Sequence, residues 1–187
     1  MNDIVTSGLY PMFSLETPRL LLRRAKGADV DAIFAWAKDP DVTRYGGWDA
    51  HQTLSDTQEF VDNCFKQYAE FGLGPWIIER RDNHVVIGTC GFGDVNRAHR
   101  YAAMGYFLAR DQWGQGFGTE AARAVLEFGL GPLGMQRVEA HCAVENTASE
   151  KVLLKIGMRF EAVLRSRMYK NGKSLDVKIY ARLRGEG

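Results

Sequence analysis

The sequence contains few cysteines and no long uninterrupted apolar run. Its three cysteines, Cys64, Cys90 and Cys142, are odd in number and widely spaced, which argues against a disulfide framework or a paired-cysteine metal site. No stretch approaches the ~18 consecutive apolar residues of a membrane-spanning helix, so we expect no membrane partner. The first 14 residues lack the basic start and apolar segment of a signal peptide, and a cytoplasmic protein is therefore expected.

Net charge is also nearly absent. The 187 residues include 24 Lys+Arg and 23 Asp+Glu, a formal charge of +1, which gives no general electrostatic reason to bind nucleic acid. The two ends of the chain nevertheless differ. Residues 29–62 carry eight acids and two bases, whereas residues 159–187 carry eight bases and three acids. The basic end leaves contact with RNA or a ribosome open, although lysines at a strand edge also serve to discourage aggregation.

Composition and length indicate an ordinary folded domain. With 45% hydrophobic and 25% charged residues the chain is not disordered. It is long enough to bury a core without a disulfide or a structural metal, and we expect no metal site. No repeat, low-complexity tract or internal boundary is visible. We therefore expect a flexible lead-in over residues 1–14, followed by one domain over residues 15–184, as a monomer or a homodimer.

Hydrophobic periodicity and turn residues predict the order of elements. Pro40 is expected to mark the end of the first helix, with a loop over 41–54, and Ser55 and Gln58 to form a capping box that opens the second. The predicted helices cover 29–38, 55–71, 119–128 and 146–156, and the predicted strands cover 19–25, 76–79, 85–92, 101–108, 137–144, 160–169 and 175–183. This order predicts a mixed α/β fold, with a mostly antiparallel twisted sheet of about seven strands flanked by about four helices.

Glycine, at 20 residues, is the residue type in excess. Between Met104 and Ala122 a predicted strand runs through a glycine-rich turn into a predicted helix. That geometry directs unpaired backbone N–H groups and the positive end of the helix dipole at one point, which is an anion site suited to phosphate. A dinucleotide fingerprint is excluded because Thr119 stands where its third glycine belongs, and a Walker A loop because Arg167 stands where its first glycine belongs.

Taken together, the motifs resemble the GNAT superfamily of acyl-CoA-dependent N-acyltransferases, and within it the Rim-type branch, which acetylates the N-termini of ribosomal proteins. The resemblance runs from Leu15 to Arg184. Its pieces are LETPRLLLR at 15–23, WAKDPDVTRY at 36–45, IGTCGF at 87–92, GYFLARDQWGQGFGTEA at 105–121, NTASEKVLLKIGM at 146–158, and the Asn171-Gly172 hairpin with Asp176.

The resemblance implies that acetyl-CoA is the cofactor and assigns residues to it. The pyrophosphate loop falls on residues 113–118, with Trp113 where the family usually has Gln or Arg. Asn146 would reach the pantetheine arm, and main-chain groups of Phe107 and Leu108 would pair with it as an added strand does. The backbone amides that would hold the pyrophosphate are those of Gln115, Gly116, Gly118 and Thr119.

The reaction needs a base for the amine and a proton for the leaving thiolate. Ser149, three residues after Asn146, is the expected acid, because Leu153 stands where many relatives have a tyrosine; the alternative is an ordinary helix-start serine. His141 is the expected base and Glu139, on the same strand face, its substitute. A structural histidine and a water relay stay open as alternatives. Cys90 and Cys142 are expected to be small core residues rather than nucleophiles.

In the resembled fold the first two helices and their connection border the acceptor cleft. The acids that this chain carries there would attract a cationic amine or a basic N-terminus, and Tyr45 and Trp48 could pack on the acceptor. Solvated helix faces and a core aromatic are the alternative. We expect an N-acetyltransferase that acts on a protein or peptide N-terminal amine by direct attack on the thioester. The alternatives are the same chemistry on a small amine, such as an antibiotic or a polyamine, and a non-catalytic acyl-CoA-binding module.

Overall fold

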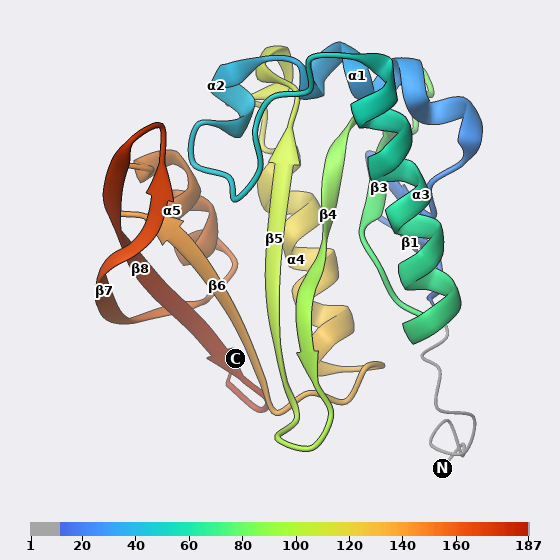
Figure 1. The fold of residues 1–187 in the computed structure, drawn as a ribbon. Coiled ribbons are helices and arrows are strands. Elements are labelled where there is room, and N and C mark those ends of the chain that lie inside the picture. The colour runs from blue at the N-terminus through green and yellow to red at the C-terminus, as the bar shows by residue number, and fades with distance from the viewer. Residues whose placement is uncertain (1–11, 187) are drawn as a thin grey trace.

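One sheet organises the computed structural model, which describes residues 12–186 (Figure 1). Its strands lie in the order β1-β2-β3-β4-β5-β6-β8-β7. All neighbours are antiparallel except β5 and β6, which are parallel. The strands are β1 (Leu15–Glu16), β2 (Leu20–Arg23), β3 (Trp76–Arg80), β4 (Val86–Asn96), β5 (Tyr101–Leu108), β6 (Arg137–Ala143), β7 (Arg159–Lys170) and β8 (Lys173–Leu183).

Helices cover both faces of the sheet. In Figure 1, α3 lies in front of the strands and α4 behind them; α1 packs on α3 and β4, and α5 packs beside α4. The helices are α1 (Val30–Ala37), α2 (Pro40–Thr43), α3 (Leu54–Phe71), α4 (Phe117–Leu130) and α5 (Thr147–Lys155), with 3₁₀ turns at Gly27–Asp29 and Arg110–Gln112. Within residues 12–186 no helix combines the length and the apolar character needed to cross a membrane.

The mixed α/β class and the mostly antiparallel sheet are as predicted, and three local predictions are corrected. The described residues form eight strands and five helices rather than seven and four, because the short β1 pairs with β2 and because Pro40 begins α2. Proline fits there because the first turn of a helix needs no N–H bond from it, and Asp39 caps the turn by accepting from the N–H of Asp41. The capping box of α3 is made by Thr53 and Asp56, not by Ser55 and Gln58.

Part of the predicted lead-in is ordered. Residues 1–11 lie outside the described residues. The side chain of Met12 is buried, however, and the carbonyl of Phe13 accepts a hydrogen bond of 2.8 Å from the indole Nε1 of Trp76. The chain is thus attached to the sheet before β1 begins.

The core extends over both faces of the sheet, and one side of it lies between α4 and the strands. Small and aliphatic side chains of α4, among them Ala121, Ala122, Val125 and Leu126, are fully buried. A Cβ on Gly129 would lie 2.8 Å from a methyl group of Val138, so glycine is what allows this last turn to approach β6. The close contact holds α4, and with it the glycine-rich turn before α4, at a fixed height over the strands.

A buried charge cluster attaches the segment before α1 to the sheet edge. The Arg23 side chain is only 9% exposed; it pairs with Asp29 at 2.8 Å and with Glu79 at 2.6 Å. Burial opposes ionisation of both carboxyl groups, but the hydrogen bonds from Arg23 outweigh it and hold their pKa values below the usual range. The cluster therefore carries its charges at neutral pH.

We predict that Arg23→Met destabilises the protein by about 3–5 kcal/mol at pH 7, since it leaves two buried carboxylates without a cation. Because the folded-state pKa values of Asp29 and Glu79 are depressed, their contribution is complete above the ordinary carboxyl pKa of ~4 and is lost as the pH falls below it. In urea unfolding, the difference in free energy of unfolding between the variant and wild type should become smaller as the pH falls below ~4. Arg81→Met, at a 47%-exposed side chain, is the control. A loss of stability no larger than that of the control would contradict the prediction.

Candidate active site

The sheet opens where β5 leaves β6. Strand β5 pairs with β4 as far as Leu108, but its pairing with β6 ends at Met104, opposite Ala140. Beyond that point β6 continues along β8 only, and the two strands diverge toward the top of Figure 1. The last residues of β5, 105–108, therefore have no strand beside them on the β6 side.

Two cavities meet at this opening. The smaller, of about 600 Å³, is lined by the end of β5, the turn before α4 and the first turn of α5. The larger, of about 1090 Å³, lies between α1, α3 and strands β4 to β7. Phe107 lines both cavities, so the two cavities adjoin at this residue.

The N-terminus of α4 opens into the smaller cavity without a side-chain cap. Gly116 is its N-cap at φ +84°, in the left-handed region, and no side chain accepts from the first turn. Within residues 12–186, the N–H groups of residues 115–119 have no protein acceptor. A Cβ on Gly118 would lie 3.0 Å from Leu108. Free N–H groups in a turn with glycine at positions 114, 116 and 118 fit a pyrophosphate.

A hydroxyl pair lies across the same cavity. The side chain of Asn146 caps α5 by accepting from the N–H of Ser149 at 3.1 Å. This fixes the serine 2.8 Å from the hydroxyl of Tyr106 on β5. Burial raises the pKa of Tyr106, although its bond to Ser149 opposes the shift, so the phenol keeps its proton at neutral pH.

Tyr106 is a polar site residue that the sequence analysis did not select. Its strand was expected to contribute main chain only, at Phe107 and Leu108. Alternation places Tyr106 on the opposite strand face from Phe107, toward α5. No local pattern singles it out, because its role comes from the contact with Ser149 on α5. The Leu108 carbonyl, in turn, already accepts a hydrogen bond from the indole of Trp113 at 2.9 Å.

Glu139 and His141 share a face of β6, as predicted, and line the larger cavity. They contact each other at 3.3 Å, and Glu139 also accepts from Arg137 at 2.9 Å. Arg137, which the sequence analysis also missed, makes a two-pronged pair with Glu161 at 2.8 and 2.7 Å. Glu139 is therefore already engaged by a cation, whereas no other partner of His141 is found in the described part of the chain.

The two predicted acceptor residues lie on different sides of the opening. Trp48 lines the larger cavity and packs edge-on against Phe107, with the ring centroids 5.1 Å apart. Tyr45 lines the smaller cavity, beside α2. Proximity along the chain suggested a common place, but the bend after α2 separates the two rings.

Lys170 joins the β7–β8 hairpin to the loop that carries Trp48. From the end of β7 its ammonium group donates to the Trp48 carbonyl and to the Asp49 carboxylate, each at 2.6 Å. Its side chain is only 9% exposed. The basic hairpin is thus tied to two residues that line the larger cavity, about 120 residues away in the chain.

The larger cavity is lined by more acids than bases. The acids are Asp49, Asp56, Glu59, Asp94 and Glu139, and the bases are Arg137 and Arg167. Aromatic rings of Trp36, Trp48, Phe60, Tyr101 and Phe107 line it as well. Acidic and aromatic groups together suit an ammonium group.

The cysteines lie inside the protein. Cys90 is fully buried, Cys142 is 5% exposed, and burial raises the pKa of Cys142 to about 11. Its thiol therefore stays protonated at neutral pH, which does not favour a nucleophilic role.

A mixed sheet that splits beside a glycine-rich helix N-terminus defines the class of GNAT acyltransferases, and comparison with known proteins agrees. Residues 19–159 match the acetyltransferase (GNAT) domain family. The chain belongs to this family, and it is an N-acetyltransferase that uses acetyl-CoA.

Two relatives illustrate the similarity in sequence. The chain is 37% identical over 173 residues to YoaA of Bacillus subtilis (strain 168), described as an uncharacterized N-acetyltransferase, covering 92% of this chain and 97% of YoaA. It is 29% identical over 132 residues to the ribosomal-protein-serine acetyltransferase of Escherichia coli (strain K12), covering 71% and 73% of the two chains.

Two solved structures show the similarity in fold. An acetyltransferase (GNAT family) from Bacillus anthracis superposes with a TM-score of 0.83 at 26% identity, covering 93% of this chain and 100% of that one. The spermidine N-acetyltransferase of Vibrio cholerae, solved with CoA and spermine, shares the fold with a TM-score of 0.78 at 21% identity, covering 90% and 97%.

Proposed function

We propose that the domain formed by residues 15–184 transfers an acetyl group from acetyl-CoA to the N-terminal amine of a protein or peptide. The observation that carries this proposal is the pair of cavities that meet at Phe107. One cavity has an anion cradle and hydroxyl donors, and the other has acids, aromatic rings and a histidine. Two reactants held from opposite sides of one opening would meet in line, which supplies much of the rate of a two-substrate reaction.

The smaller cavity takes acetyl-CoA, which supplies an acyl thioester when bound. The N–H groups of Gln115, Gly116, Gly118 and Thr119 hold the pyrophosphate. The unpaired end of β5 offers to the pantetheine amides the main-chain groups of Tyr106 and Leu108, because those of Phe107 face Thr89 on β4. Asn146 lies beside the same path. The Leu108 carbonyl already accepts a hydrogen bond from the Trp113 indole. Leu108 therefore binds the pantetheine arm through its N–H, or through its carbonyl if the indole moves away.

The catalytic groups act from the two sides of the opening. On the cofactor side, Ser149 donates a proton or a hydrogen bond to the leaving thiolate, and Tyr106, 2.8 Å from its hydroxyl, supplies that proton in turn. On the acceptor side, His141 takes the proton of the attacking amine. Glu139 orients the imidazole and balances its charge. In a variant without His141, Glu139 is the substitute base, acting directly or through a water molecule.

The acceptor is a cationic amine that enters past Trp48. The acidic lining favours a protonated amine from water. His141 removes the proton that blocks attack and passes it to water, and then takes the second proton as the C–N bond forms. That second proton balances the one that Ser149 gives to the thiolate. A ribosomal protein N-terminus is supported by the Escherichia coli relative. A polyamine is the second candidate, supported by the aromatic and acidic lining together with the fold shared with the spermidine enzyme.

The acceptor class is tested by thiol release from acetyl-CoA against two panels matched in concentration. One panel holds N-terminal peptides with different first residues, and the other holds polyamines and antibiotic amines. Mass spectrometry then locates the acetyl group. We expect turnover on peptides, at the α-amine. Turnover on polyamines alone would replace the acceptor assignment, and CoA binding without turnover on either panel would favour a non-catalytic module.

We predict that Gly118→Val abolishes measurable CoA binding, because a branched side chain would fill the cradle against Leu108. Isothermal titration calorimetry measures the affinity, and circular dichroism checks the fold. Gly27→Ala is the control, since nothing lies within 4 Å of a Cβ at that glycine. Unchanged CoA affinity in a folded Gly118→Val protein would overturn the loop assignment.

We predict that Ser149→Ala lowers kcat by about 10²–10⁴-fold, the usual contribution of a positioned proton donor, and leaves the CoA dissociation constant nearly unchanged. Tyr106→Phe, which removes only the hydroxyl behind the serine, should lower kcat less. Steady-state kinetics at saturating acetyl-CoA and a separate CoA titration distinguish the two effects. A Ser149→Ala enzyme with the wild-type kcat would exclude the serine as the acid.

A further inference from the structure

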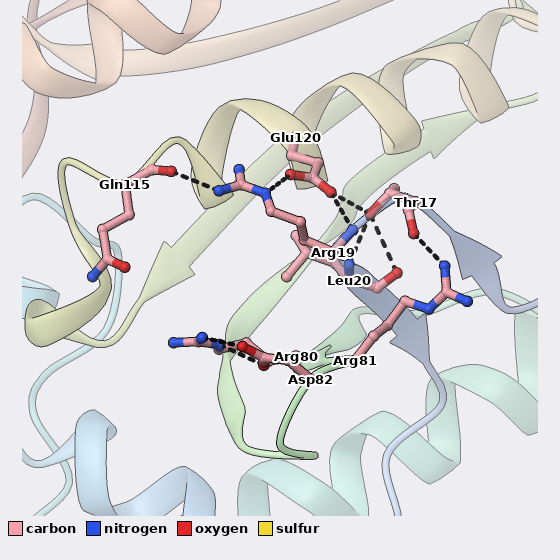
Figure 2. Close-up of polar contacts among 8 residues, drawn as sticks. All are labelled: Thr17, Arg19, Leu20, Arg80, Arg81, Asp82, Gln115 and Glu120. Atoms are coloured by element: carbon pink, nitrogen blue, oxygen red, sulfur yellow. Dashed lines mark hydrogen bonds and ion pairs between the residues drawn. The ribbon is translucent and has the colours of Figure 1, made fainter.

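The turn before α4 is held from behind by a side chain of the sheet edge. Figure 2 shows Arg19, just before β2, reaching between Glu120 of α4 and the backbone of Gln115. Its Nη1 donates to the Gln115 carbonyl at 3.0 Å, and its Nε donates to Glu120 at 2.6 Å. About 100 residues of chain separate Arg19 from both partners.

Glu120 collects three donors from the β1–β2 turn. It accepts from the Thr17 hydroxyl at 2.6 Å, from the Arg19 backbone N–H at 2.9 Å and from the Arg19 guanidinium (Figure 2). Its side chain is 16% exposed. Burial works against its ionisation, but these donors outweigh burial and hold its pKa below the usual range. The carboxylate is therefore charged and fixed in place at neutral pH.

The contact with Gln115 sets the direction of one peptide group. In a turn that binds an anion, N–H groups must point inward, so the carbonyls between them need donors elsewhere. Arg19 provides such a donor for the Gln115 carbonyl, whose peptide unit carries the N–H of Gly116. The guanidinium also lies over the Phe117 ring, 4.4 Å from its centroid, and within 3.3 Å of where a Cβ on Gly116 would be.

We propose that Arg19 and Glu120 are positioning residues for the cofactor, which keep the turn at residues 114–119 in the conformation that receives the pyrophosphate. The inference rests on the proposed role of that turn. Neither residue lines the smaller cavity, so both act through the backbone. Preorganisation of this kind raises affinity because the turn need not be ordered on binding.

The test measures CoA binding by calorimetry in Arg19→Met, which keeps the length of the side chain and removes its donors. We expect the dissociation constant to rise about tenfold or more, the usual effect of losing a residue that orients a binding group. Amide hydrogen exchange at residues 114–119 should become faster. At saturating acetyl-CoA, kcat should match wild type.

Arg81→Met is the matched control. Arg81 donates to the Thr17 carbonyl at 2.7 Å and pairs with Glu16, so it belongs to the same edge but does not contact the turn. It should leave both CoA affinity and amide exchange unchanged. Glu120→Gln, which keeps the size of the side chain, should weaken CoA binding as much as Arg19→Met does. The double variant should bind CoA no more weakly than the single variant with the lower affinity. Additive losses would overturn the coupling.

Dephospho-CoA separates positioning from direct contact with the cofactor. It keeps the pyrophosphate and lacks the 3′-phosphate, so Arg19→Met should weaken CoA and dephospho-CoA by the same factor. A loss confined to CoA would mean that Arg19 binds the 3′-phosphate and would overturn the proposal. Unchanged affinity in Arg19→Met beside lost affinity in Gly118→Val would overturn the positioning role alone, whereas unchanged affinity in both would overturn the turn as the pyrophosphate site.

Discussion

The end of the β5–β6 pairing at Met104 and Ala140 is the constraint on which the rest of the site depends. A sheet normally satisfies its backbone groups strand by strand, and here one strand is left without a neighbour over residues 105–108. The divergence also separates the side chains that follow. Tyr106 turns toward Ser149 on α5, and His141 turns toward the larger cavity. One change in pairing thus creates a binding edge, a passage and two chemically different sides.

The cofactor side is a backbone surface, and its shape is maintained from a distance. An uncapped helix start binds anions only while its N–H groups converge, and a turn with glycine at positions 114, 116 and 118 has the freedom to lose that shape. The close approach of α4 to β6 at Gly129 fixes the helix, and the Arg19–Glu120 pair fixes the turn before it. Both restraints lie outside the cavity, so the backbone groups inside it stay free.

Sequence patterns predicted the features that depend on local rules. The glycine turn, the helix start at Asn146 and the hairpin at Asn171-Gly172 each follow from conformational preferences of a few adjacent residues, and in the structure the Asn146 side chain caps the helix that begins at Thr147. The predictions at Pro40 and at the start of α3 were wrong because, at each place, two competing signals for a helix end or a helix start lie within a few residues of each other. Tyr106, Arg137, Arg19 and Lys170 could not be selected, since each gains its role from a partner on another element, up to about 120 residues away. Tyr45 shows the converse: nearness to Trp48 in sequence did not place it in the same cavity.

The two sides of the opening also differ in how readily substitution changes them. In the proposed assignment, backbone N–H groups hold the pyrophosphate, and glycine together with the Arg19–Glu120 pair keeps the turn open. Few side chains other than that pair therefore bear on the shape of the turn. The acceptor side is built from side chains of α1, α3, β6 and the hairpin, and Lys170 joins the hairpin to the loop that carries Trp48. A single substitution there changes charge, width or closure without disturbing the cofactor turn. If the proposed assignment holds, acceptor choice would depend on a few side chains and one ion pair, whereas cofactor binding would depend on the backbone turn and the pair that restrains it.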